Sequence, residues 1–310
     1  MNLIPTDQLL ATELQHISDR VSRSNQGFSS GYPAFDIDLM GGFQEGSLYC
    51  LGSVASMGKT MVALNFVVKQ LQNLAFNEVI VFVSTETSRP VLIQKLLAIA
   101  TGIELRKIQS SALTDSDLET LKNHSFLTLL KSNNLIIIEE NMPNMIDIEE
   151  AMNISVKEGK IPKMLYIDCL HDMQVNIENK NSEQAIFSLM HKLKVMAAQF
   201  KVPVLFTSKV SKNVFYRKQG QVPKLDDLLF SRFIAEIADY VFMLHRPNYY
   251  QIPDESVLNN ADEELHLYCR KNQNLPLNVV VMGANLKTHQ ILEEPNYNKM
   301  EPISVNLTKE

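Results

Sequence analysis

The stretch Ser53–Thr60 has the residue types and spacing of a phosphate-binding loop. It reads Ser-Val-Ala-Ser-Met-Gly-Lys-Thr, follows an apolar run and opens a segment of helical periodicity. Backbone N–H groups at a helix N-terminus attract phosphate oxygens, and a lysine and a hydroxyl here would bind the β- and γ-phosphates and Mg²⁺. The usual first glycine is Ser53, with Gly52 one position earlier. We expect nucleotide contacts from Ser53, Ala55, Ser56, Met57, Gly58, Lys59 and Thr60.

Two carboxylates at predicted strand ends complete the chemistry of nucleotide hydrolysis. Asp168 ends the apolar run 164–167, where it would hold Mg²⁺ together with Thr60. Glu86 follows the run 81–85, where it would polarise the attacking water as a general base. The alternative for each is an ordinary solvated acid at a strand end. With Lys59, these residues form the predicted catalytic set.

A sheet of buried strands must position these residues. Most of the predicted strands are continuously apolar, as expected for strands covered on both faces, and they alternate with helical segments, which predicts an α/β, doubly wound, mostly parallel sheet flanked by helices. The tail predicts antiparallel strands at 265–270, 277–282 and 290–293. The main strands are expected at 47–52, 78–84, 135–139, 164–168, 203–208 and 240–244, and helices at 59–74, 90–100 and 182–200.

An amphipathic helix is predicted over Thr6–Ser24, because Leu10, Leu14 and Ile17 recur at helical spacing. A polar stretch follows it, so we expect a helix and linker over 1–26 and one ATPase domain over 27–310. The helix either folds back onto its own core or docks on a neighbouring subunit.

Composition indicates an ordinary globular protein of the cytoplasm. Hydrophobic residues make up 45% and charged residues 21% of 310 residues, and no apolar run reaches the length of about 20 that spans a bilayer. We therefore expect no membrane association. The three isolated cysteines form no disulfide framework, and the seven histidines show no zinc-binding spacing. A net charge of −6 argues against a surface covered in nucleic-acid-binding charge, although a local basic loop remains compatible with it.

Several motifs together resemble the C-terminal ATPase domain of the DnaB-type replicative helicases, within the RecA-like P-loop superfamily. The similarity covers roughly 26–293, and the family's separate N-terminal collar domain has no counterpart. Glu86 matches the family's catalytic glutamate, and the predicted helix at the N-terminus lies where the family has its subunit-linking helix. The motifs are the approach Gly41–Leu48, the loop Ser56–Thr60, Ile167–His171, Val202–Val204 and Leu225–Arg246.

The resemblance implies a RecA-like core that assembles into a hexameric homo-oligomer and hydrolyses ATP with Mg²⁺ between subunits. It also implies single-stranded DNA in the central channel and replication or loader proteins as partners. Two segments, 174–182 and 209–224, match the channel loops, and the second has no acidic residue. Their cations suit phosphate contacts, the alternative being ordinary solvated lysines. The DNA-binding candidates are Lys180, Lys212, Arg217, Lys218 and Lys224.

Two departures from the family pattern concern the γ-phosphate. Lys209 stands where the family has the glutamine of its Ser-Gln-Leu sensor, and it would contact the phosphate as a point charge. In the family's Lys-Gln-Arg-Asn-Gly motif, which supplies cations to the neighbour's nucleotide, Lys271 is retained and Gln273 replaces the arginine. Arg270 is near, but adjacent strand residues face opposite sides. Because such an arginine raises rates by orders of magnitude, ATP binding is a firmer expectation than fast hydrolysis.

Three functions remain open at this point. The first is an ATP-dependent DNA helicase or translocase core. The second is an ATP-binding assembly or adaptor protein derived from a helicase core, with weak or no hydrolysis. The third is a recombination ATPase resembling RadA, whose Lys-Asn-Arg-Phe-Gly motif has no counterpart here.

Overall fold

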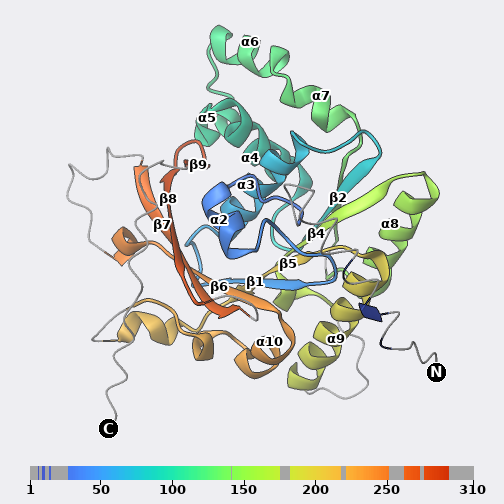
Figure 1. The fold of residues 1–310 in the computed structure, drawn as a ribbon. Helices are drawn as coiled ribbons and strands as arrows, with labels where there is room; N and C mark the ends of the chain where they lie inside the picture. The colour runs from blue at the N-terminus through green and yellow to red at the C-terminus, as the bar shows by residue number, and fades with distance from the viewer. Residues whose placement is uncertain are drawn as a thin grey trace.

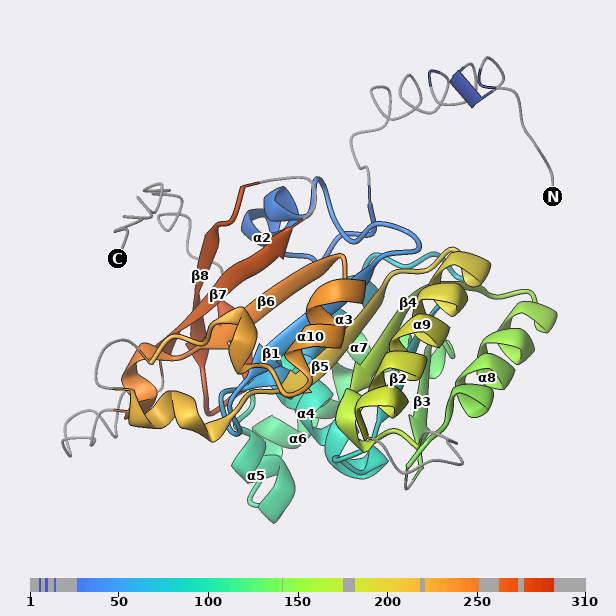
Figure 2. The same ribbon diagram turned by 90° about the horizontal axis from the view of Figure 1, so that it is seen from below.

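A single nine-stranded sheet organises the described part of the chain (Figures 1 and 2). The computed structural model describes residues 27–140, 142–174, 182–217, 221–250, 262–272 and 276–292, together with Thr6, Leu9, Leu10 and Leu14. The strand order is β3-β2-β4-β5-β1-β6-β7-β8-β9. All pairings from β3 to β6 are parallel, and those from β6 to β9 are antiparallel. The expected doubly wound, mostly parallel sheet with an antiparallel tail is confirmed.

The strands lie close to their predicted positions. β2 and β3 have the predicted bounds, whereas β4 begins earlier and β7 is longer at both ends. The strands are β1 (Leu48–Ser53), β2 (Glu78–Ser84), β3 (Leu135–Glu139), β4 (Ile161–Asp168), β5 (Val204–Lys209), β6 (Tyr240–His245), β7 (Asp262–Asn272), β8 (Val279–Asn285) and β9 (Gln290–Leu292).

Helices cover both faces of the sheet (Figure 2). α3 packs against β1 and α4 on one face, while α8, α9 and α10 pack together on the other. The helices are α2 (Pro33–Asp38), α3 (Lys59–Leu71), α4 (Arg89–Thr101), α5 (Leu105–Ser110), α6 (Asp115–Asn123), α7 (Phe126–Lys131), α8 (Met145–Lys157), α9 (Ser182–Phe200) and α10 (Ser231–Ile237); short 3-10 turns are η1 (Leu170–Asp172), η2 (Lys212–Tyr216), η3 (Leu225–Asp227) and η4 (Pro247–Tyr250).

The core lies between the central strands and their covering helices. Every residue of β1 and of β6 is buried, as the apolar runs predicted for strands covered on both faces. Three aromatic rings link α2 to α3 and β6, because Phe35 stacks on Phe66 at 5.2 Å and packs against Phe242 at 4.9 Å. These contacts hold the P-loop helix firmly against the sheet.

The antiparallel tail returns to the P-loop helix. Asn65 of α3 donates to the His289 carbonyl at 2.7 Å and accepts from the Ile291 N–H at 2.9 Å. Gln290 donates to the Ile99 carbonyl of α4 at 2.9 Å. The turn before β9 is thereby fixed beside the carboxyl edge of the parallel strands, where the functional residues gather.

At the N-terminus, Thr6, Leu9, Leu10 and Leu14 are helical, and the side chains of the three leucines are exposed. The rest of the predicted helix and linker lies outside the described residues, so the proposed boundary at 26 stays a prediction. Within the described residues, no helix combines the length and apolarity needed to cross a membrane. The three cysteines are buried and free, in line with structural thiols.

Candidate nucleotide-binding site

The P-loop connects the carboxyl end of β1 to the first turn of α3. Ser56 and Gly58 have positive φ values of 64° and 106°, which turn the chain so that its backbone faces one cavity. Met57 is buried, so its side chain anchors the loop in the core and any nucleotide contact must come from its backbone. The geometry is that of an anion-binding helix N-terminus.

The loop opens onto a cavity of about 600 Å³. Of the predicted site residues, Glu86, Asp168, Lys209 and Lys212 share this cavity with the loop. Lys95 and His289 also line it, and neither was predicted. The loop residues that line it are Ala55, Ser56, Gly58, Lys59 and Thr60.

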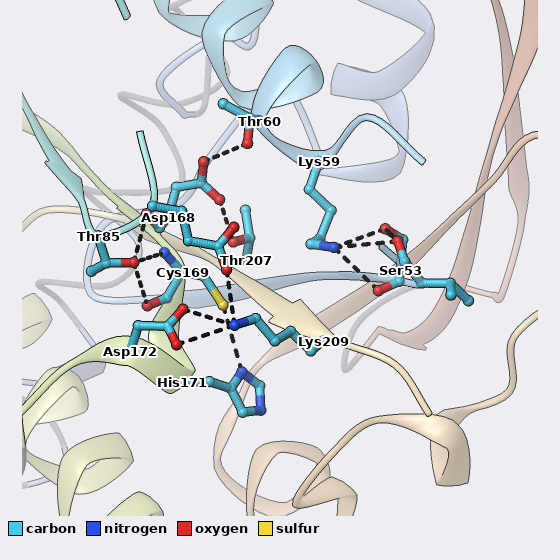
Figure 3. A network of polar contacts seen from close by, with 12 residues as sticks. Ser53, Lys59, Thr60, Thr85, Asp168, Cys169, His171, Asp172, Thr207 and Lys209 are labelled. Atoms are coloured by element: carbon cyan, nitrogen blue, oxygen red, sulfur yellow. Dashed lines mark hydrogen bonds and ion pairs between the residues drawn. The ribbon is translucent and has the colours of Figure 1, made fainter. Parts of the chain in front are cut away.

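Lys59 folds back onto its own loop. Its ammonium donates to the Ser53 carbonyl at 3.2 Å and to Ser53 Oγ at 3.1 Å (Figure 3). Burial lowers the pKa of Lys59, and the nearby acidic groups, including Asp168, oppose that shift. The ammonium is therefore held by weak neutral acceptors, which a phosphate can replace with a charge-assisted bond.

Asp168 is positioned by two hydroxyls. Thr60 Oγ1 donates to Asp168 Oδ2 at 2.6 Å, and Thr207 Oγ1 of β5 donates to Asp168 Oδ1 at 2.6 Å (Figure 3). The carboxylate belongs to a residue that is only 3% exposed, so both oxygens are fixed in direction. Hydroxyl and carboxylate oxygens are the ligands that Mg²⁺ prefers, and Thr60 with Asp168 fits such an ion.

Lys209 joins Glu86 to Asp172. Its ammonium lies 2.8 Å from Glu86 Oε1 and 2.9 Å from Asp172 Oδ2. Glu86, Cys169 and Asp172 each bring one potential ligand atom within 4.8 Å of the others, and the single charge of Lys209 offsets one of the two carboxylate charges in this cluster. Partial burial lowers the pKa of Lys209, but the hydrogen bonds to Glu86 and Asp172 outweigh it and raise the pKa above its ordinary value.

Sequence reasoning missed four residues around the cavity. Burial lowers the pKa of Lys95 and of His289, whereas the charges of Asp168 and Glu86 act in the opposite direction on Lys95. Lys95 lies on α4, the helix that follows the predicted base Glu86. Its position on the first helix after a strand end with a predicted catalytic residue is the signal by which it could have been predicted. The others, Asp172, Thr207 and His289, follow no motif that we recognised.

The basic loop between β5 and η3 presents only some of its cations to solvent. Lys212 and Lys224 are exposed, and so is Tyr216 at 82%. Arg217 instead forms an ion pair with Asp227, whose side chain is 8% exposed. The two further DNA-binding candidates, Lys180 and Lys218, lie outside the described residues.

The candidates for a trans-acting cation make contacts within their own chain. Lys271 donates to the carbonyls of Ala235 at 2.8 Å and Ala238 at 2.5 Å, at the C-terminus of α10. Arg270 donates to the Pro223 carbonyl at 3.1 Å and lies over the Tyr268 ring. Gln273 lies outside the described residues.

Comparison with known proteins identifies the family of the chain. The probable replicative DNA helicase of Trieres chinensis is 31% identical over 268 residues, which cover 82% of this chain and 54% of that protein. The replicative DNA helicase DnaB of Treponema pallidum (strain Nichols) is 26% identical over 282 residues, covering 90% and 58%. The chain thus spans little more than half the length of these curated relatives.

The fold agrees with solved structures and with a family model. A solved ATPase domain superposes with a TM-score of 0.83 at 22% identity, covering 94% of this chain and 100% of that one, which confirms the RecA-like fold. A DnaB-like replicative helicase, solved in a study of its interactions with primase, superposes with a TM-score of 0.79 at 22% identity, covering 94% and 67%. The model described as DnaB-like helicase C terminal domain matches residues 27–292. Because that match spans most of the chain, this protein belongs to the DnaB-like helicase C-terminal domain family.

Proposed function

We propose that the chain is the ATP-hydrolysing core of a DNA helicase or translocase. The observation that carries this proposal is the convergence of Lys59, Thr60, Glu86 and Asp168 on one cavity at the carboxyl edge of the sheet. Membership of the family supports the same reaction, and the curated relatives named above are replicative DNA helicases.

Each residue would have a defined role in hydrolysis. The phosphates would lie on the backbone of the P-loop, and the Lys59 ammonium would leave Ser53 to bind them. Thr60 and Asp168 would hold Mg²⁺, which supplies neutralisation of charge on the β- and γ-phosphates when it is bound. Glu86 would orient the attacking water and accept its proton.

The proposed partners are single-stranded DNA and further copies of this chain. Lys212 and Lys224 provide exposed cations on the basic loop, and phosphate contacts of this kind give strong salt dependence. We further propose a hexamer with ATP at subunit interfaces, with Lys271, Arg270 or Gln273 facing the neighbour's nucleotide, and docking of replication or loader proteins. The helix and linker over 1–26 would join subunits.

The decisive experiment measures the rate of ATP hydrolysis with and without single-stranded DNA, alongside the mass of the nucleotide-bound assembly. We expect stimulation by DNA, and loss of hydrolysis in Lys59→Ala with an unchanged thermal unfolding curve. The matched control is Lys163→Gln, because Lys163 lies on β4 at the end opposite to Asp168. Absence of DNA-stimulated hydrolysis and of unwinding at low salt would exclude this function.

A second function is favoured by the ion pair between Lys209 and Glu86, which engages the proposed base. An ATP-binding assembly or adaptor protein would use nucleotide as a structural ligand with negligible turnover. Tight ATP binding without multiple turnovers would support this alternative, and robust multiple-turnover hydrolysis would rule it out.

A further inference from the structure

Lys209 reaches the phosphate cavity from the strand next to the P-loop. β1 and β5 are parallel neighbours, and the Cα atoms of Ser53 and Lys209 are direct partners in their register. Lys209 also lines the cavity that Lys59, Thr60 and Glu86 share. This cation therefore belongs to the same subunit as the P-loop, on a rigid element, and needs no contribution from a second chain.

The partners of Lys209 are two carboxylates, of which that of Glu86 lines the cavity. Its ammonium lies 2.8 Å from Glu86 Oε1. It also lies 3.1 Å and 2.9 Å from the two oxygens of Asp172 (Figure 3). The side chains are 39% exposed for Lys209, 50% for Glu86 and 36% for Asp172. Ion pairs with this exposure contribute little net stability, so another anion can replace one of them.

A nucleoside triphosphate would supply that anion. Its terminal phosphate carries concentrated charge and several acceptor oxygens, and lysine binds phosphate as a flexible point charge. Glu86 would lose its cation on exchange, whereas Asp172 would still hold the Lys209 side chain near the cavity. A diphosphate lacks the group that competes with Glu86.

We propose that Lys209 acts in cis on the γ-phosphate, and that its transfer from Glu86 to this phosphate releases Glu86 as the base. The inference rests on the proposed function, because it requires ATP on the loop Ser53–Thr60. Water oxygen forms the new bond to the γ-phosphorus and its proton passes to Glu86. The bond from that phosphorus to the bridging oxygen breaks, and its electron pair leaves with ADP while Lys209 offsets the charge. Such a cation raises the rate whether it comes in cis or in trans.

The first test compares Lys209→Gln and Lys209→Arg with the wild-type chain. Affinities for a β,γ-imido analogue of ATP and for ADP are measured by calorimetric titration in Mg²⁺. We expect Lys209→Gln to lower the affinity for the analogue by about 10- to 100-fold, the effect of losing one charge-assisted hydrogen bond, and to leave the affinity for ADP unchanged. Lys209→Arg keeps the charge and should retain the preference for the analogue. Lys163→Gln, which removes another strand lysine paired with a glutamate, should alter neither affinity.

The second test asks whether Glu86 and the phosphate compete for the ammonium. Glu86→Gln removes the competing carboxylate, so it should raise the affinity for the analogue by several-fold. Adding Lys209→Gln to this variant should abolish that gain in affinity. If Lys209→Gln fails to fold, Glu86→Gln remains, and it should tighten binding of the analogue without affecting that of ADP.

Two results would overturn this inference and leave the proposed function intact. One is an equal loss of analogue and ADP affinity in Lys209→Gln, and the other is an unchanged analogue affinity in Glu86→Gln. In both cases wild-type binding and hydrolysis would still stand. A wild-type chain that binds no nucleotide would instead refute the proposed function.

Discussion

Thr207 decides how the metal-binding carboxylate is oriented. Its hydroxyl donates to Asp168 at 2.6 Å, and both residues are buried. Thr207→Val keeps the shape of the side chain but leaves a buried carboxylate oxygen without this donor, which costs about 1–3 kcal/mol of stability. We expect a lower free energy of unfolding in urea and a higher Mg²⁺ requirement for hydrolysis. Thr207→Ser should restore both, and a variant with wild-type values for both would show that the bond is dispensable.

Two cations of the basic loop should behave differently on substitution. Lys212 is exposed, so Lys212→Ala should weaken binding of single-stranded DNA and reduce the slope of log affinity against log salt by about 0.7. Arg217 is paired with Asp227, so Arg217→Ala should chiefly lower the thermal unfolding temperature. Fluorescence anisotropy across a salt series measures the first effect. Equal salt slopes for the two variants would contradict this division of roles.

The sequence predicts the members of the site that follow short motifs. Lys59, Thr60 and Asp168 lie at the end or start of an element with a recognisable pattern, and Glu86 lies two residues beyond such an end. The structure brings all four to one cavity. Thr207 and His289 are different, because their position depends on strand register and on the return of the tail. Such long-range contacts leave no local pattern in the chain.

At the scale of elements, the start of α8 is fixed by a reciprocal cap. Asn144 accepts from the backbone N–H of Ile146 at 2.7 Å, and Asp147 accepts from the N–H of Asn144 at 2.8 Å. Asn144→Ala should lower the free energy of unfolding by about 1 kcal/mol in urea denaturation. The control is Thr114→Ala, which removes the same kind of cap from α6, a helix without buried residues. An equal decrease in the free energy of unfolding in both variants would show that the packing of α8 against the core does not increase the contribution of its cap.

Element bounds departed from prediction where pairing overrode local sequence. β4 begins at Ile161 rather than 164, because Pro162 pairs opposite Val79 beside a shift in register. Proline lacks an N–H and is disfavoured inside central strands, so Pro162 gives no strand signal in the sequence. β7 continues through Glu263 and Glu264, whose charge gave no strand signal, since β8 supplies the partner hydrogen bonds.

At the scale of the whole molecule, acid should loosen the join between the parallel and antiparallel halves of the sheet. His245 ends β6 and pairs with His266 of β7. Burial, and to a smaller degree the charge of His266, lowers the pKa of His245 from 6.5 to about 4. Between these values the unfolded chain binds a proton that the folded chain does not, so stability falls as pH falls.

We therefore expect the free energy of unfolding to decrease by about 2–3 kcal/mol between pH 6.5 and pH 4 through His245. Urea denaturation across this range measures it, and His245→Gln should flatten the curve. Some slope should remain, because burial also lowers the pKa of His171 and His289. An identical pH dependence in His245→Gln would refute the assignment.

The central position of β1 in the sheet delays its pairing during synthesis of the chain. β2 pairs with both β3 and β4, so these three strands can associate once Asp168 has left the ribosome. β1 must wait for β5 and β6, which end at Lys209 and His245. At ordinary rates of translation β5 follows β1 after a delay on the order of ten seconds, during which β1 has both edges unpaired. One edge then stays unpaired until β6 is made. Nascent chains released before His245 should therefore aggregate or engage chaperones, whereas longer ones can close the sheet around β1.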